Sequence, residues 1–478
     1  MVVGLASELE RAQARIAELE ARLGRDSTNS SIPPSADSIA AKAKRRADRS
    51  SRERSADRKP GGQPGHKGSG LAPTVTPDRT ETLPAPGACS GCGGDLIGAA
   101  DAGMSWAQVW DILAITLEKV HYLLPRRRCG CGHTTTAAPP LGAAGTVTYG
   151  PNINAAAILL ASEGNVPLER TALLMEALLG VSVSTGFVAR TLQRVAQRLA
   201  AHGFDDAMTS ALRAEDVLCA DETPINVIGK GTAANGEPVP GSPHAVTVRT
   251  PDARLVWYAP ISSRSKTAIA GLGVMEGYTG YLVRDDYAGW HQFDAQLDGV
   301  QQCAAHLIRH AKGVLELHPT HQKWAGEVIT VLREAATAVT TAQTEGNDQL
   351  DPSLITKLRA RYDDAVQWGI TTNRHRSWPK GNHPGYTLAK RLHDKADQVW
   401  TFTRNLSVPW TNNASEQALK APKRHQAVSS YWHTLTTLAQ YCRVRSYLLS
   451  ARNHGIRPID AIHDALTGNP WLPAIPTA

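Results

Sequence analysis

The first segment of the chain has hydrophobic residues at helical spacing. Between residues 5 and 23 they recur in steps of three and four, and Gly24 ends the pattern. The positions are Leu5, Leu9, Ala12, Ile16, Leu19 and Leu23. This spacing is the seam of a heptad repeat, with Glu and Arg on the outer positions. It predicts a helix over residues 1–24 that either associates with a second copy or lies on the body of the protein.

The next segment, residues 25–86, has no helical or strand period. It contains NSSIPPS and KPGGQPGHKG, and is rich in Ser, Pro and Gly. This composition is typical of a linker with little fixed structure. We therefore expect packed domains only after it.

A helical pattern returns within residues 141–210. The segments PLERTALLMEALLG and TGFVARTLQRV predict two short amphipathic helices, separated by Gly180 and an N-cap at Ser184. Two helices joined in this way are a candidate helix-turn-helix motif. In that motif Arg190 and Arg194 would face the major groove of DNA. A plain helical hairpin has the same pattern.

Residues 211–302 read as strands. A short apolar strand at 217–220 ends on Asp221, and two further strands are predicted at 244–250 and 255–260. After a gap long enough for a helix, an apolar strand at 280–283 ends on Asp285-Asp286. Acids therefore end two strands of one predicted α/β unit.

The remaining chain is mostly helical by pattern. Residues 303–408 include EVITVLREAATAV and SLITKLRARYDDAVQW, whose apolar positions have the period of a helix. Residues 409–478 contain a long predicted helix from about Thr434 to Asn453. We expect this part of the chain to fold mainly as helices.

Composition excludes a membrane protein. Of the 478 residues 42% are hydrophobic and 20% are charged, and no apolar run is long enough to cross a bilayer. The start MVVGLASELERAQ lacks the features of a secretory signal. The expectation is a cytoplasmic protein with no membrane partner.

The net charge of +7 is concentrated in one segment. Residues 42–67 hold ten Lys and Arg against three Asp and Glu, so 10 − 3 accounts for the whole excess. Lys44, Arg45 and Arg46 are the densest part of this arm. Such an arm either contacts DNA phosphates through counterion release or is an inert, solvated tail.

Four of the seven cysteines form two close pairs within residues 87–140. The pairs are Cys89 with Cys92 and Cys129 with Cys131, and each is followed by glycine. Four thiolates in this pattern predict a zinc ribbon with a structural Zn²⁺ site. The intervening AQVWDIL and KVHYLLPRRR look like its strands. His133 can replace one cysteine ligand, and free thiols are the alternative.

The acids at the strand ends have a chemical interpretation. Carboxylates from adjacent strand ends converge, and hard oxygen ligands suit Mg²⁺. Two such ions, about 3.5–4 Å apart, catalyse phosphoryl transfer. Glu222 is the poorer candidate because strand alternation points it away from Asp221. Each aspartate alone is equally well explained as a turn residue, and Asp286 remains an alternative to Asp285.

A third acid lies far along the chain, in PWTNNASEQALKAPKRHQ. Glu416 can complete a capping box with Asn413 as the N-cap, or it can be the third metal ligand. Basic residues follow it: Lys420 lies one turn on, Pro422 is expected to break the helix, and a basic edge is expected after it, formed by Lys423, Arg424 and His425.

These motifs together resemble the transposases of the insertion-sequence-66 family. The matching pieces, in order, are NSSIPPS, GGQPGHKG, the Cys pairs, TYGPNINAAAILLASEGNVPLERTALLM, ADET, DDYAGW, CAAHLIRH and NNASE. The resemblance implies an RNase H-like core with a helical insertion, and Asp221, Asp285 and Glu416 as the DDE triad. Three departures occur: Asp286 replaces a usual Gly, Thr411 a common Asp, and Gln417 a typical Arg.

The motif CAAHLIRH brings further candidates. His306 and Arg309 share one helical face, where they can contact DNA or orient a carboxylate; a structural histidine is the alternative. Cys303 is predicted to pack in the core.

The full hypothesis is a DDE transposase that binds double-stranded DNA and holds two Mg²⁺ (or Mn²⁺) ions. It would be nucleoid-associated, form a homo-oligomer on DNA and use helper proteins from the same element. A rival hypothesis is a DNA-binding protein or repressor that keeps the fold without the chemistry.

Overall fold

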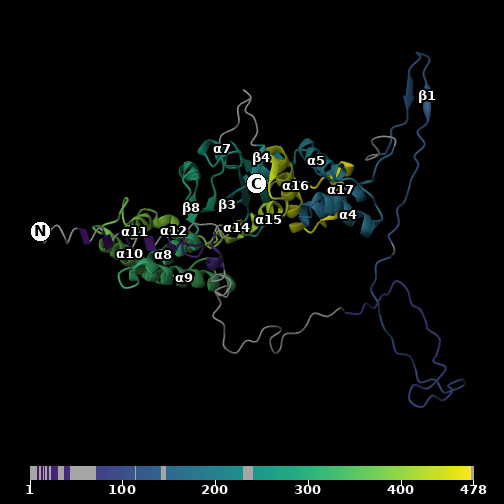
Figure 1. The fold of residues 1–478 in the computed structure, drawn as a ribbon, viewed down its shortest axis with the longest axis horizontal. Coiled ribbons are helices and arrows are strands. Elements are labelled where there is room, and N and C mark those ends of the chain that lie inside the picture. The colour runs from purple at the N-terminus through teal and green to yellow at the C-terminus, as the bar shows by residue number, and fades with distance from the viewer. Residues whose placement is uncertain are drawn as a thin grey trace. The chain divides into compact units, whose positions relative to one another are not determined.

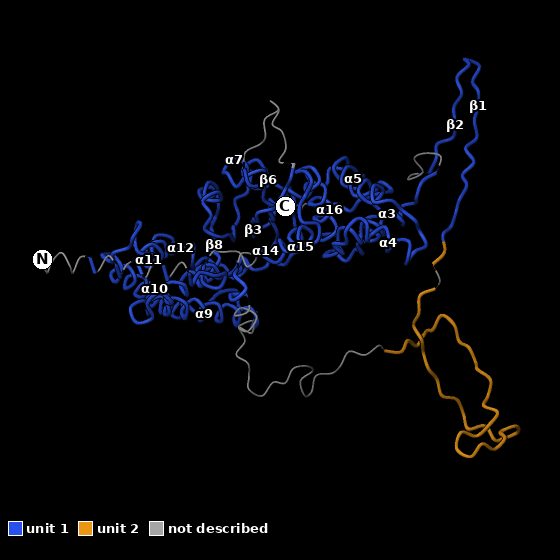
Figure 2. The backbone as a smooth tube through the Cα atoms, viewed as in Figure 1, with its two compact units in different colours: residues 1–45, 117–478 blue, residues 46–116 orange. Residues whose placement is uncertain are grey.

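The computed structural model describes residues 23–30, 37–42, 72–113, 115–140, 147–229 and 241–474, with scattered positions between residues 8 and 20. Residues 46–116 form one compact unit, and residues 1–45 with 117–478 form the other (Figure 2). The positions described between 8 and 20 are helical, as the heptad pattern predicts. The basic residues Lys44, Arg45 and Arg46 lie outside the described residues.

Part of the predicted linker is structured. Ser27 and Asp37 are buried, and Asp37 Oδ1 accepts a hydrogen bond from the Ser27 backbone at 2.8 Å. The Asn29 side chain donates to Glu316 Oε2 at 2.8 Å. Within the predicted linker, residues 25–30 therefore have fixed structure, because Ser27 pairs with Asp37 and Asn29 bonds to the helix that carries Glu316.

A five-stranded mixed sheet forms the centre of the larger unit. Its order is β6-β5-β3-β7-β8. β5 pairs antiparallel with both β3 and β6, whereas β7 and β8 run parallel to β3. The strands are β3 (Val217–Pro224), β5 (His244–Arg249), β6 (Val256–Ile261), β7 (Tyr281–Arg284) and β8 (Gly299–Gln302). All but β8 were predicted.

Helices from both ends of the unit cover one face of this sheet. Leu218 and Ala220 of β3 share a hydrophobic core with residues of these helices. The helices are α3 (Pro151–Ile158), α5 (Thr185–Ala201), α6 (Phe204–Arg213), α16 (Leu435–Asn453) and α17 (Pro458–Thr467). The domain boundary predicted at residue 210 thus falls inside one hydrophobic core.

The helical insertion covers the other face. Val217 and Cys219, which alternate with the residues above, pack in a second core with Val283 and with insertion residues such as Trp324 and Trp400. Figure 1 shows these helices as a lobe beside β8. They are α8 (Ala304–Leu317), α9 (Lys323–Thr344), α10 (Pro352–Asn373), α11 (Pro384–Asp394), α12 (Ala396–Val399) and α13 (Thr401–Arg404).

The predicted long helix α16 protects the free edge of the sheet. Ser446 Oγ accepts a hydrogen bond from the Tyr258 backbone at 2.8 Å, and Ser450 Oγ accepts one from Val256 at 3.0 Å. An open edge strand exposes backbone groups that invite pairing with another chain. The two serines, spaced one helical turn apart, satisfy alternate N–H groups of β6.

Several smaller elements complete the described structure. The helix-turn-helix segment consists of α4 (Leu168–Leu179), which ends at Gly180 with φ of 65°, and α5, whose N-cap Ser184 accepts from the Phe187 backbone. β4 (Val227–Gly229) pairs with β9 (Trp432–Thr434), a contact that was not predicted. None of the helices in the described part of the chain is long and apolar enough to cross a membrane.

Candidate active site

Two of the predicted acids lie on the same side of the sheet, towards the carboxyl ends of two neighbouring strands. β3 and β7 are parallel neighbours, with Cys219 opposite Val283. Two residues further on are Asp221, which lies within β3 and pairs with Thr247, and Asp285, which follows the last residue of β7. The prediction that the first strand ends on Asp221 is therefore wrong, because its pairing with β5 carries β3 on to Pro224. Burial, followed by the negative charges of Glu222, Asp285 and Glu416, holds the pKa of Asp221 well above its usual value. The third acid therefore also lies within electrostatic reach of Asp221.

Asn412 fixes the helix that carries Glu416. Its side-chain amide donates to the Ala220 carbonyl at 2.7 Å, immediately before Asp221. Its backbone N–H donates to Cys303 Sγ at 3.1 Å. The Glu416 backbone N–H in turn donates to the Asn412 carbonyl at 3.2 Å. The short helix α14 (Asn413–Ala418), which carries Glu416, is thereby held next to β3.

The predicted capping box at this helix is wrong. The N-cap of α14 is Asn412, and no side chain caps the helix. The Asn412 amide donates its hydrogen bond to β3 and not to the helix, and Asn413 is the exposed first residue of the helix. The Glu416 carboxylate is consequently free to point into the site.

Glu416 faces His306 of α8. His306 Nε2 lies 3.6 Å from Glu416 Oε1, and this oxygen is buried without a hydrogen-bond partner among the described residues. Burial lowers the pKa of His306, although the charge of Glu416 opposes the shift. Burial also raises the pKa of the Cys303 thiol to about 12. Cys303 is buried, as predicted, and its Sγ lies with ligand atoms of His306 and Glu416 in a group in which all are within 4.8 Å of one another.

Glu222 has protein partners of its own and is linked to Asp285 through one of them, Arg264. Its carboxylate accepts from Arg264 Nε at 2.6 Å and from Trp290 Nε1 at 2.7 Å. The Arg264 guanidinium lies 3.5 Å from the centre of the Tyr287 ring and 3.6 Å from Asp285 Oδ2. Strand alternation correctly separated Glu222 from Asp221. Arg264 had no sequence signal, because it lies in a loop without a recognisable motif.

The adjacent acids 285 and 286 have different surroundings. Asp285 Oδ1 accepts the Tyr287 backbone N–H at 2.9 Å. Asp286 instead binds cations from the insertion, Lys395 among them. Burial would raise the pKa of Asp286, but the hydrogen bond from Lys395 and the charge of Arg391 outweigh it, and the pKa lies below its usual value. Asp286 is thus occupied by protein partners.

The basic edge after Glu416 differs in part from its prediction. Pro422 does not break a helix: it lies in the first turn of α15 (Lys420–Ser429), where proline is tolerated. His425 stacks on Trp432 at 4.3 Å, and burial lowers its pKa to about 4, so it carries no charge at neutral pH. Lys420 and Arg424 are exposed, and Lys423 donates to the Pro224 carbonyl.

The remaining residues predicted to contact DNA differ in whether protein groups already bind their side chains. Arg190 is exposed on α5. Arg194 donates to Asn154 Oδ1 and Thr191 Oγ1, both at 2.6 Å, so its guanidinium joins α5 to α3. Arg309 is half-buried on α8, one turn beyond His306.

Each cysteine pair occupies a tight turn. Gly93 and Gly132 have φ of 75° and 90°, and their N–H groups donate to the Cys89 and Cys129 carbonyls. The backbone N–H groups of Cys92 and Cys131 lower the pKa of the Cys89 and Cys129 thiols. The two pairs lie in different compact units, so the four-cysteine zinc set stays a prediction.

The strands predicted between the cysteine pairs are mostly wrong. Residues 107–113 form no strand, and of residues 119–128 only β1 (Arg126–Arg128) does, paired with β2 (Thr134–Thr136). All residues of both short strands are exposed. Residues 107–113 are mostly apolar and rich in strand-forming residues, but they are almost entirely exposed. Because strand formation depends on packing against neighbouring side chains, this sequence by itself does not form a strand here.

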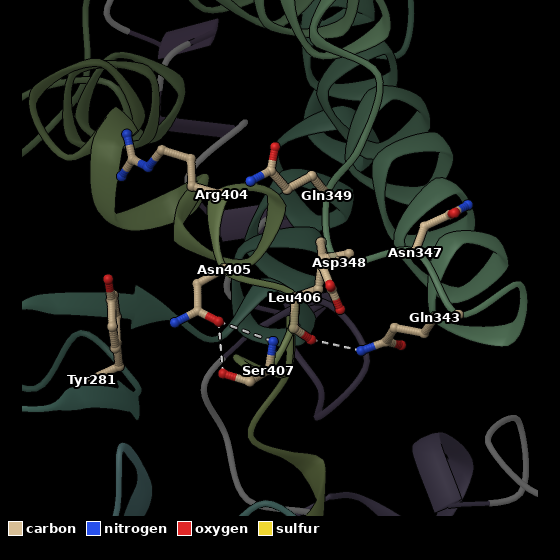
Figure 3. A pocket seen from close by; sticks show the side chains of 10 residues that line it. Tyr281, Gln343, Asn347, Asp348, Gln349, Arg404, Asn405, Leu406 and Ser407 are labelled. Carbon is tan, nitrogen blue, oxygen red and sulfur yellow. Dashed lines mark hydrogen bonds between the residues drawn. The ribbon is translucent and has the colours of Figure 1, made fainter.

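A pocket lies at the other end of the sheet from the acids. Figure 3 shows polar side chains around it, including Tyr281, Gln343, Arg404 and Asn405. Tyr281 is the first residue of β7, whereas Asp285 follows its last. The pocket therefore plays no part in the acid cluster.

The part of the chain that the structure describes is an α/β protein whose mixed five-stranded sheet carries acids at two neighbouring strands and holds a glutamate helix beside them. The family model described as Transposase IS66 family matches residues 146–439, more than half of the 478 residues. The chain belongs to this family, and the protein is a transposase. Residues 1–72 match a family of unknown function, DUF6444.

Other comparisons add little. No curated protein matches the chain. A solved structure entitled Drosophila P element transposase strand transfer complex is similar at 14% identity, covering 64% of this chain and 92% of that one, with a TM-score of 0.30. A likeness this distant carries no argument about the site.

Proposed function

We propose that the protein is a DDE transposase with an RNase H-like core, in which Asp221, Asp285 and Glu416 hold two Mg²⁺ (or Mn²⁺) ions. The observation that carries the proposal is the convergence of these acids, which are separated by up to 416 − 221 = 195 positions in sequence. Strands β3 and β7 supply two of them at one edge. Asn412 brings the helix of the third to the same edge.

The residues present suit divalent cations. The three side chains offer hard oxygen donors, the kind that Mg²⁺ prefers. The raised pKa of Asp221 and the Glu416 oxygen without a hydrogen-bond partner mark a cluster of negative charge, which Arg264 approaches only at Asp285, 3.6 Å away. When bound, a pair of such ions supplies Lewis-acid activation of the attacking oxygen and stabilisation of the leaving one.

The protein's own residues orient the carboxylates for this reaction. Asn412 sets the distance of Glu416 from β3, and the Tyr287 backbone directs Asp285 Oδ1. The exposed cations Lys420 and Arg424 follow Glu416 along the chain and would bind the phosphates of double-stranded DNA. Arg190, Lys423 and Arg309 extend the proposed DNA contacts, as do His306 and the arm at Lys44, Arg45 and Arg46.

The wider assembly is also a proposal. The heptad helix would join copies of the chain on DNA, and the cysteine turns would share a structural Zn²⁺ through Cys89, Cys92, Cys129 and Cys131. We propose that helper proteins of the same element take part and that the protein works at the nucleoid.

The test is a cleavage and joining assay. The protein is incubated with DNA carrying the ends of its element, together with a target plasmid, with Mg²⁺ or with EDTA. We expect a nick that exposes a 3′-OH at the end, followed by its joining to target DNA, only when Mg²⁺ is present. Binding of end DNA with neither cleavage nor joining would contradict the proposal.

The acid cluster also predicts how stability depends on pH. Above about pH 4 the unfolded chain has lost the Asp221 proton, whereas the folded, metal-free protein retains it. Its stability should therefore fall as pH rises towards the folded pKa. Mg²⁺ competes with that proton, so the rise in Tm caused by Mg²⁺ should grow with pH.

Thermal unfolding between about pH 5 and about pH 8, with Mg²⁺ or EDTA, measures this effect. Asp221→Asn should flatten the loss in EDTA and remove most of the Mg²⁺ shift. A Mg²⁺ shift that is the same at every pH, or that persists in this variant, would show that the cluster does not bind the metal.

A further inference from the structure

Asp286 is the most heavily bound acid near the site. Its Oδ1 accepts hydrogen bonds from Lys395 Nζ and from Gln302 Nε2 at 3.1 Å, and lies 3.2 Å from His291 Nε2. Its Oδ2 lies 3.5 Å from Arg391 Nη1. Four side chains thus surround one half-buried carboxylate.

Two of these partners come from the insertion. Arg391 lies in the last turn of α11, and Lys395 links α11 to α12. Arg391 is itself fixed, because its Nη2 lies 2.8 Å from His310 Nδ1 on α8. Side chains of the insertion therefore bind the loop that follows β7.

Asp285 lies immediately before the gripped residue. Its carbonyl accepts from Arg284 Nη1 at 2.8 Å, and the fully buried Arg284 is paired with Asp294 at 2.7 Å. The main chain of Asp285 is thus held by the sheet on one side and by Asp286 on the other. Its own side chain receives one backbone hydrogen bond, from Tyr287.

We propose that Asp286 is a positioning residue for Asp285, and that Lys395 and Arg391 make the placement of Asp285 depend on the helical insertion. The inference rests on the proposed function, in which Asp285 holds a metal ion. Positioning matters here because a displacement of about 1 Å in a catalytic group can cost about 10²-fold in rate. The insertion then forms a lobe of its own and also holds Asp285 in place in the active site.

A charge effect alone predicts opposite results for two substitutions, whereas a positioning role predicts the same result for both, so Lys395→Met distinguishes them. Asp286→Asn removes a negative charge near the site, which by itself weakens binding of Mg²⁺. Lys395→Met removes a positive charge, which by itself strengthens it. If Asp286 acts by positioning, both variants should raise the Mg²⁺ concentration for half-maximal cleavage, by about tenfold. The double variant should be no worse than either single variant, because both break one interaction.

The experiment measures cleavage rate against Mg²⁺ concentration for the full-length protein. Lys395→Arg should recover most of the wild-type value. Lys390→Met, which breaks the exposed pair with Asp394 at 2.9 Å on the same helix, is the matched control and should leave the value unchanged. Loss of folded protein alone would lower the amplitude without moving the half-maximal concentration. If Asp286→Asn does not fold, Lys395→Met and Lys395→Arg carry the test.

The outcomes separate the two proposals. A lower half-maximal Mg²⁺ concentration in Lys395→Met, or unchanged values in both variants, would overturn the positioning role while Asp285→Asn still abolishes cleavage. Full activity in Asp285→Asn would instead overturn the proposed function.

Discussion

Asp221→Asn, Asp285→Asn and Glu416→Gln should each reduce cleavage and strand transfer by about 10³-fold or more, since each removes an anionic ligand of the metal ions that would stabilise the transition state. All three side chains converge on one edge, so no single substitution should leave a working site. The substitutions keep the size of each side chain, and binding of end DNA should persist. Rates are measured with labelled end DNA, and binding is measured by gel shift.

The matched control is Asp252→Asn. Asp252 lies in the turn that joins β5 to β6, away from the acid edge, and binds Arg254 there. It should retain wild-type cleavage. Activity in any of the three acid variants close to that of this control would remove the residue concerned from the proposed triad.

The second large effect is expected at a residue that touches no substrate. Asn412→Ala removes the hydrogen bond between the glutamate helix and the Ala220 carbonyl. The buried carbonyl then lacks a partner, at a cost of about 1–3 kcal/mol in the free energy of unfolding. Because Glu416 is displaced relative to Asp221, the cleavage rate should fall by about 10²-fold.

Asn413→Ala is a close control for this result. Asn413 is the neighbouring asparagine and is exposed at the start of α14. Its replacement should change the rate and the denaturant midpoint little. Equal losses in the two variants would mean that helix capping, and not docking on β3, is what the asparagines contribute.

Most strands of the sheet were predicted from local patterns, although their order in the sheet was not. Buried runs with an acid at the end predicted β3 and β7, because a strand between two covered faces must be apolar along its length. β8 is short and ends in two glutamines, and it was missed. Its Gln301 is buried because its amide finds backbone partners, at 3.1 Å in the case of Val399. Burial of a polar residue through such pairing leaves no periodic signal.

The interpretation of Glu416 shows where local reasoning stops. The sequence around it has the spacing of a capping box, and the structure uses Asn412 for a contact with a residue 192 positions away. Likewise, Pro422 looked like a helix breaker, yet it lies in the first turn of α15. Local preferences amount to about 1 kcal/mol at a cap, so a buried long-range hydrogen bond can override them.

By itself, the sequence determined the order of the main elements, the helical character of residues 303–408 and the presence of an acid in β3 and another after β7, because hydrophobic period and turn residues act over short distances. Only the tertiary structure decided which asparagine holds the glutamate helix, why Glu222 pairs with Arg264, and how the insertion binds Asp286. Those contacts join side chains from separate elements. Their energy depends on distance and burial in the folded chain, which no local pattern encodes.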